Sequence, residues 1–241
     1  MKEKTTELTI WQHLDELRRR LMHSMIALVV GVIISIIFAE FLLEVVAQPI
    51  GGFDRLLSIV VTENFSVYFR VTLLGGFIIA FPFMLFQIYL FIAPGLTKDE
   101  RRYVLWAIPS ALGLFIIGAA FAYFVMLPGA LPFLLEFPGP NVLPKWKDYV
   151  NFVTSLIFWI AISFETPLIM YVLAKLGIID AKGLAKGWRI AVIVIAIVAA
   201  VATPTPDPIN MIILMIPLLV LYGLGILLAT LAQRESKHSR N

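Results

Sequence analysis

Residues 71–97 read VTLLGGFIIAFPFMLFQIYLFIAPGLT, a run without a single Asp, Glu, Lys or Arg. A helix needs about 20 mainly apolar residues to cross the hydrocarbon core of a bilayer, so this run is long enough to span a membrane. Five further apolar runs lie between residues 21 and 232. The sequence therefore predicts an all-α membrane protein, with six transmembrane helices in a single domain.

The composition excludes an ordinary soluble domain. Hydrophobic residues make up 60% and charged residues 15% of the chain, against about 45–50% apolar and about 25% charged residues in soluble domains. The net charge is +3, but Lys and Arg lie in short tracts beside the apolar runs, so no nucleic-acid-binding surface is expected. The absence of cysteine excludes disulfides, iron–sulfur clusters and thiolate metal sites.

The charges between the runs divide the chain into spans and loops. Transmembrane helices are predicted at residues 21–47, 69–93, 102–127, 150–176, 187–203 and 208–231. One side of the membrane receives residues 1–20, 94–101, 177–186 and 232–241, and the other receives 48–68, 128–149 and 204–207. The fifth helix, about 24 Å long, is shorter than the hydrocarbon core of about 30 Å. It relies either on snorkelling flanks or on a locally thinned bilayer.

Lysine and arginine predict the orientation of these spans. The two terminal segments hold five and three of the 19 Lys and Arg residues, and residues 94–102 and 175–189 hold three and four. Only four lie on the other side. Because positively charged loops are retained in the cytoplasm, both termini are expected there.

Prolines predict bent helices and a capped outer face. Pro82, Pro109, Pro167 and Pro217 lie inside four predicted spans, and an internal proline removes a helical hydrogen bond. Bent helices favour a concave bowl or groove over a straight bundle. The loop at residues 128–149 contains five prolines, so a cap of short helices and turns is expected on the outer face.

The spans lack the residues of known intramembrane catalysis. The one histidine in an apolar run, His23, lies at the inner edge, and no span interior contains an aspartate. The sequence has no phosphate-binding loop, no H-E-x-x-H zinc motif and no G-x-S-x-G elbow. We expect neither an enzyme nor a bound metal or cofactor.

Glu165 is the carboxylate that most needs an explanation, because it falls at membrane depth. A charge there costs about 2.5–3.5 kcal/mol on insertion scales. Two interpretations stay open. Glu165 is either a neutral acid bonded to a neighbouring helix, for example to a carbonyl freed by Pro167, or a polar anchor in a groove for a partner helix or a passing substrate.

Three other carboxylates have local explanations. Glu16 lies in residues 9–21, predicted to form an amphipathic helix at the cytoplasmic surface that begins with a Thr9–Gln12 capping box, and it is spaced to pair with Arg20. Glu100 follows Thr97 by three residues, which also fits a capping box. Asp207 precedes Pro208 and fits the N-cap of the last helix.

The string HLDELRRRL at residues 13–21 resembles the H-L-x-E-L-R-x-R-L signature of TatC, the multispanning subunit of the twin-arginine protein translocase. Three further matches follow in order: FIAPGL at 91–96 with ERR at 100–102, FETP at 164–167, and TP at 203–204 with Asp207. Together they cover nearly the whole chain. Residues 222–223 read Tyr-Gly, where the family is expected to carry Tyr-Glu.

The resemblance implies a receptor in the bacterial cytoplasmic membrane for folded proteins whose signal peptides carry two adjacent arginines. It implies export driven by the proton-motive force, assembly with the single-span subunits TatA and TatB, self-association and contact with membrane lipid. Docking of one partner is expected on the short fifth helix.

The resemblance also assigns residues. Signal-peptide binding is expected at Glu16, Glu100, Arg18 and His13, and a partner-helix site in the groove at Glu165. Structural or assembly roles are expected for Pro49, Phe91, Pro94, Pro167, Pro204 and Asp207. A bidentate arginine fork recognises a carboxylate, which suits two acidic residues near the bilayer, although the neighbouring arginines would repel such a peptide unless they bind lipid or hold the carboxylates.

Two alternative functions are weighed against the receptor. A proton-coupled transporter or channel would use Glu165 as its coupling carboxylate and would need further polar partners at the same depth. A structural scaffold would tolerate the loss of both Glu16 and Glu100.

Overall fold

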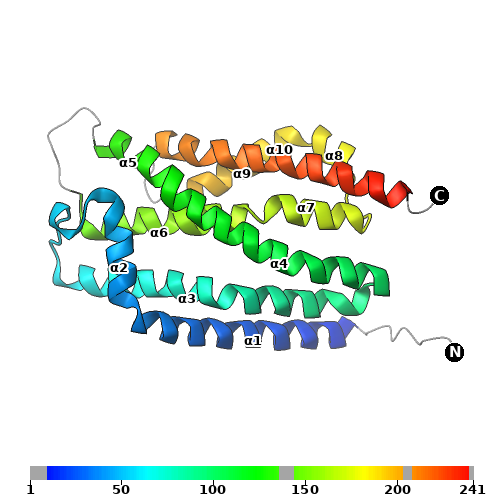
Figure 1. The fold of residues 1–241 in the computed structure, drawn as a ribbon, viewed down its shortest axis with the longest axis horizontal. Helices are drawn as coiled ribbons and strands as arrows, with labels where there is room; N and C mark the ends of the chain where they lie inside the picture. Colours follow the sequence, from blue (N-terminus) through cyan, green and yellow to red (C-terminus); the bar gives the residue numbers. More distant parts are fainter. Residues whose placement is uncertain (1–9, 136–143, 203–207, 239–241) are drawn as a thin grey trace.

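The computed structural model describes residues 10–135, 144–202 and 208–238. Within these residues the regular elements are helices, with one isolated bridge between Leu57 and Lys145, which confirms the all-α prediction there. In chain order they are α1 (Ile10–Ile37), α2 (Ala39–Ala47), η1 (Gln48–Ile50), η2 (Phe53–Arg55), α3 (Val61–Ile92), η3 (Ala93–Gly95), α4 (Lys98–Phe121), η4 (Ala122–Met126), α5 (Leu127–Leu135), α6 (Trp146–Ser163), α7 (Thr166–Lys175), α8 (Ala181–Lys186), α9 (Trp188–Ala202) and α10 (Pro208–His238) (Figure 1).

The long helices run along the long axis of the molecule, with α4 crossing the others obliquely (Figure 1). In the described part of the chain, five helical stretches are long and apolar enough to cross a membrane. The helix α9 is also apolar but has only 15 residues, about 22 Å at 1.5 Å per residue. A short apolar helix is therefore present where the sequence predicts the short fifth span.

The N-terminal region differs from the prediction. Residues 9–21 were expected to form a separate surface helix, followed by a span at 21–47, but α1 is one continuous helix from Ile10 to Ile37. Its sequence contains no proline, so nothing interrupts the hydrogen bonding at the charged segment. The interruption comes instead at Phe38 (φ −101°, ψ 15°), after which α2 turns across the end of the bundle (Figure 1).

Glycines allow α1 and α3 to pack closely. A methyl group on Gly31 would collide with the backbone carbonyl of Gly76, and one on Gly76 would lie 2.6 Å from the backbone nitrogen of Val32. Small residues at such crossings let two membrane helices approach and gain van der Waals contact. This crossing fixes α1 along the length of α3.

Helices α3, α4 and α6 begin earlier than the predicted spans, at Val61, Lys98 and Trp146. For α3, the Glu63 carboxylate accepts a hydrogen bond from the backbone nitrogen of Ile59 (3.1 Å). This bond helps to start the helix inside the predicted loop 48–68. The first turns of these three helices contain polar residues. The hydropathy pattern does not predict them, because they lie outside the apolar runs.

The fourth predicted span consists of two helices. The helix α6 ends at Ser163 and α7 begins at Thr166, with Pro167 in its first turn. The expectation of a proline inside a continuous helix is therefore wrong for Pro167, which sits where its missing N–H has no helical partner in any case. Pro82, Pro109 and Pro217 do lie inside helices, in α3, α4 and α10.

Short helices form a cap at the end of the bundle opposite the start of α1 (Figure 1). The hydroxyl of Tyr149 donates to the carbonyl of Val46, and that of Tyr123 donates to the carbonyl of Val45, both at 2.8 Å. Pro49 lies in the first turn of η1 in this region. The main buried core extends from the cap into α6, where Val150, Val153 and Ile160 are fully buried.

Candidate functional site

The start of α1 packs on the end of α3, at the end of the molecule away from the cap (Figure 1). The ring of His13 stacks on the ring of Phe91, with 4.5 Å between centroids and 19° between planes. These residues are far apart in the sequence, and both belong to motifs singled out above. The fold brings the two motifs together.

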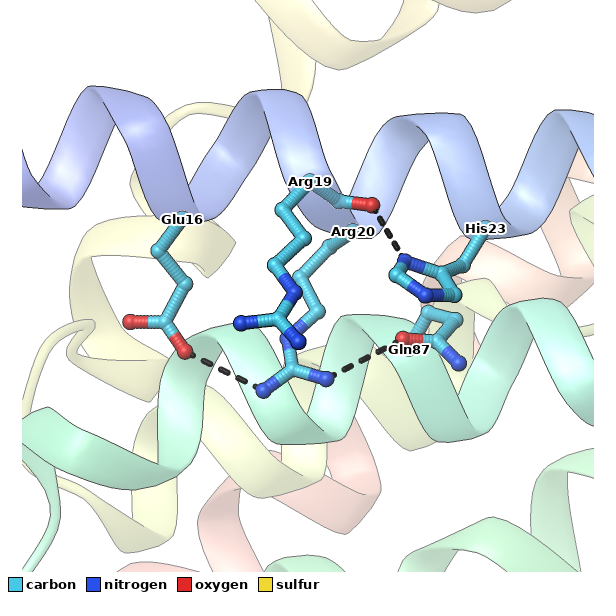
Figure 2. A network of polar contacts seen from close by, with 5 residues as sticks. All are labelled: Glu16, Arg19, Arg20, His23 and Gln87. Carbon is cyan, nitrogen blue, oxygen red and sulfur yellow. Dashed lines mark hydrogen bonds and ion pairs between the residues drawn. The ribbon is translucent and has the colours of Figure 1, made fainter.

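Arg20 bridges the same two helices. Its guanidinium lies 3.3 Å from Glu16 Oε1 and donates to Gln87 Oε1 at 3.4 Å (Figure 2). The predicted Glu16–Arg20 pair is confirmed. The two side chains are 26% and 21% exposed, and an i,i+4 pair on a helix contributes only about 0.3–0.5 kcal/mol, so Arg20 holds the carboxylate of Glu16 weakly. Gln87, a buried amide in an otherwise apolar run, was not predicted as a site residue, and its polarity is the signal that could have found it.

Glu100 caps the following helix. Its carboxylate accepts from the backbone nitrogen of Thr97 at 2.8 Å, and its backbone nitrogen donates to the Thr97 hydroxyl at 3.4 Å. The predicted capping box is confirmed. The neighbouring Arg101 donates from Nε to the carbonyl of Ala93 (2.7 Å), beyond the end of α3. These bonds tie Glu100 to the same end of α3 that contacts His13.

The basic residues of α1 differ in their contacts. Arg18 is exposed. Nδ1 of His23 lies 2.6 Å from the carbonyl of Arg19 (Figure 2), so the tautomer with a protonated Nδ1 donates there. Arg20 holds Glu16, which is one of the two roles expected for the arginines next to the carboxylates.

Glu165 lies at the break between α6 and α7 and is only 7% exposed. Its Oε1 is buried and has no hydrogen-bond partner among the described residues. The expected bond from this oxygen to a neighbouring helix is therefore not seen. A pocket of about 610 Å³ opens next to this break between α7, α8, α9 and α10, with Ser163, Thr166 and Tyr222 among its lining residues.

A family model described as "Sec-independent protein translocase protein (TatC)" matches residues 12–217. The chain belongs to the TatC family. It is 36% identical over 225 residues to a TatC from Carboxydothermus hydrogenoformans, covering 92% of this chain and 93% of the relative. A TatC from Aquifex aeolicus is 35% identical over 237 residues, covering 95% of this chain and 98% of the relative.

A crystal structure described as the twin arginine translocase receptor TatC has the same fold. It superimposes with a TM-score of 0.83 at 35% identity, covering 91% of this chain and 99% of that one. This TatC-family chain is thus a subunit of a Sec-independent protein translocase and a multi-pass membrane protein.

The remaining TatC motif residues are distributed along the fold. Pro94 lies in the first turn of η3, next to the Ala93 carbonyl that binds Arg101. Pro204 and Asp207, like the expected cap residue Thr9, lie outside the described residues. Tyr222, which precedes the departure from the family pattern at Gly223, donates to the carbonyl of Leu184 at 2.7 Å. This bond ties α10 to α8 without a glutamate at position 223.

Proposed function

We propose that this TatC-family chain binds the two arginines of a twin-arginine signal peptide at the end of the molecule where α1 meets α3. The observation that carries the proposal is the packing of the start of α1 on the end of α3, through His13 on Phe91 and Arg20 on Gln87. It brings the helix that carries Glu16 to the same end of α3 to which the Glu100 region is tied.

The two carboxylates match the chemistry of the peptide. A guanidinium fork forms two parallel hydrogen bonds with a carboxylate, and a lysine ammonium does not reproduce this geometry. Among the described residues Glu16 pairs with Arg20, at 3.3 Å, so an incoming arginine competes with a weak contact. The Glu100 carboxylate accepts a hydrogen bond from the backbone N–H of Thr97 in the helix cap, and it is shared between this cap and the peptide. Arg18 and His13 border this site on α1.

The proposed orientation places this end in the cytoplasm, with α9 as the fifth and shortest of six spans. The first turns of α1 and the last turns of α10 lie at the same end of the molecule (Figure 1). Of the 16 Lys and Arg residues in the described part of the chain, 12 lie in the segments at that end, residues 10–20, 94–102, 175–189 and 233–238. Both facts agree with the positive-inside rule for an inner-membrane protein.

The pocket next to the α6–α7 break, where Glu165 lies, is the proposed site at which a partner helix binds. A buried carboxyl oxygen without a partner favours a polar group supplied by an incoming helix, since an unsatisfied buried acceptor costs about 1–3 kcal/mol. TatA and TatB are single-span helices, and α9 with its adjoining pocket offers an apolar surface for one of them. Translocation of the folded cargo is then driven by the proton-motive force, and self-association of the chain belongs to the same assembly.

A transporter would need a charged partner for Glu165. No described cation lies within ion-pair distance of Glu165, and Arg70 of α3 bonds instead to Thr154 and Ser155. Nothing therefore favours ion coupling through Glu165 over the receptor.

Binding of a twin-arginine peptide and of its twin-lysine variant to the protein in lipid nanodiscs tests the receptor proposal. The wild type is expected to prefer the arginine peptide, and Glu16→Gln and Glu100→Gln are expected to lose that preference. Asp15→Asn is the matched control, because it removes an exposed carboxylate next to Glu16 on α1.

Equal binding of both peptides by the wild type, with TatA and TatB also present, would refute the proposal. A preference that survives both glutamate substitutions would support a receptor with its site elsewhere.

A further inference from the structure

Arg70 lies deeper along its helix than the sequence pattern indicates. The helix α3 has 32 residues, about 48 Å at 1.5 Å per residue, against a hydrocarbon core of about 30 Å. When α3 is centred in the bilayer, about 9 Å extends beyond the core at each end. Arg70 is nine residues after Val61, or about 13 Å along the helix. Its Cα thus lies about 4 Å inside the hydrocarbon boundary, on the side of the cap.

The guanidinium of Arg70 is fixed by two hydroxyls from α6. Nε donates to Thr154 Oγ1 and Nη2 donates to Ser155 Oγ, both at 2.8 Å. A guanidinium has five N–H groups, so three remain after these two bonds. Among the side chains that the structure describes, no carboxylate lies within ion-pair distance of Arg70. The charge of Arg70 is held in place there without a carboxylate.

A pocket of about 430 Å³ opens beside Arg70 between α1, α3 and α6. Arg70, Thr154 and Ser155 are its polar lining residues, and the others are apolar or aromatic, among them Leu28, Phe77 and Trp159. Phe77 lies seven residues after Arg70 on α3, which is about 10 Å closer to the middle of the bilayer. The pocket is therefore cationic near the membrane surface and apolar below.

We propose that this pocket binds an anionic phospholipid, with its phosphodiester on Arg70 and one acyl chain along Phe77 and Trp159. The order of the groups along the pocket matches that of such a lipid, whose phosphate lies at the edge of the hydrocarbon core. Arginine side chains reach toward this level by snorkelling and bind phosphate oxygens in pairs. An acidic side chain of another protein would satisfy the charge but not the apolar depth of the pocket. With the orientation proposed above, the lipid belongs to the outer leaflet.

Trp159 supplies a direct reporter, because it lines the pocket. The other four of the five tryptophans are replaced by Phe, and the protein is reconstituted in phosphatidylcholine vesicles. Either brominated phosphatidylglycerol or brominated phosphatidylcholine is added at the same mole fraction, since bromine quenches tryptophan only at short range. We expect stronger quenching by the brominated phosphatidylglycerol, and loss of this difference in Arg70→Gln.

Arg55→Gln is the matched control, because Arg55 lies in η2 at the same end of the molecule and does not line the pocket. Arg55→Gln should keep the difference in quenching between the two brominated lipids. Arg70→Lys retains the charge and should also keep this difference, and it tests the proposal if Arg70→Gln does not fold. Equal quenching of the wild type by the two brominated lipids overturns the proposal and leaves the pocket to a protein partner. Loss of the wild-type difference on adding inorganic phosphate also overturns it, in favour of a free anion.

Discussion

At the residue scale, contacts between distant positions decide what this TatC-family chain can do at the end of the molecule where α1 begins. His13 stacks on Phe91, and Arg20 joins Glu16 to Gln87. Each contact is small by itself. Together they hold the first turns of α1 as part of the bundle, which gives Glu16 a fixed position relative to the end of α3.

The stack of His13 on Phe91 is expected to couple the two residues energetically. Aromatic pairs contribute about 0.5–1.5 kcal/mol beyond the area they bury. We predict that His13→Ala and Phe91→Ala lower the thermal stability by less in combination than as the sum of the two single changes. Thermal unfolding in detergent measures this. Trp11→Ala combined with Phe91→Ala is the control, since Trp11 is 79% exposed, and additive effects of His13 and Phe91 would contradict the prediction.

Glu165 is expected to lower the stability of the protein without its partners and to contribute to the binding of a partner helix. Its buried Oε1 lacks a partner among the described residues, and such a group costs about 1–3 kcal/mol. We predict that Glu165→Leu raises or maintains the unfolding temperature and abolishes co-purification with TatA and TatB, whereas Glu165→Gln retains part of it. Wild-type assembly of Glu165→Leu would rule out the partner-site role.

The residue contacts that the sequence predicts are the local ones. The Glu16–Arg20 pair and the Thr97–Glu100 capping box follow from spacings of four and three residues on a helix. The partners Gln87 and Phe91 could not be predicted, because pairing across 67 or more residues depends on how α1 and α3 are placed in the fold. Arg70 is the second residue of the span predicted at 69–93, and its depth cannot be predicted from the apolar run because α3 begins eight residues before that span, at Val61.

At the element scale, the close packing of α1 and α3 at Gly31 and Gly76 fixes the position of α1, the helix that carries one half of the proposed signal-peptide site. The apolar runs predict both helices, but the amphipathic pattern of residues 9–21 was taken for a separate surface helix. The continuity of α1 comes from packing against α3, which hydropathy alone does not register. A change at the crossing should therefore reach the site at the end of α1.

Gly76→Ala is expected to destabilise the protein by about 1–3 kcal/mol, because the added methyl group would meet the backbone of Val32 at 2.6 Å. Signal-peptide affinity should fall with it, since α1 is displaced from α3. Thermal unfolding and peptide titration measure the two effects. Gly113→Ala on α4 is the control, because nothing lies within 4 Å of its added methyl group, and equal effects of both changes would contradict this account.

At the scale of the whole molecule, the common position of the first turns of α1 and the last turns of α10 is the main structural support for the proposed topology (Figure 1). The spans, their order and the shortness of α9 follow from runs and prolines in the sequence. The contacts within the cap do not, because hydrogen bonds such as Tyr149 to Val46 join segments 103 residues apart.

The absence of cysteine from the chain allows a clean test of topology. Ser58 is an exposed residue near the cap, and Lys182 is an exposed residue of α8 at the other end of the molecule, so each is replaced by Cys in turn. A membrane-impermeant thiol reagent is added to cells whose outer membrane has been removed, and it should label Ser58→Cys at once. Lys182→Cys should be labelled only after the membrane is opened. The reverse pattern would invert the proposed orientation.

The central claim is that Glu16 and Glu100 hold the two arginines of the signal peptide, and zero-length crosslinking tests it most directly. Two peptides, with one or the other arginine replaced by lysine, are bound to the protein, and a carbodiimide joins the lysine amine to any carboxylate in contact. Mass spectrometry should find the amide bond at Glu16 with one peptide and at Glu100 with the other. Crosslinks confined to other carboxylates, such as Asp15, would contradict the account.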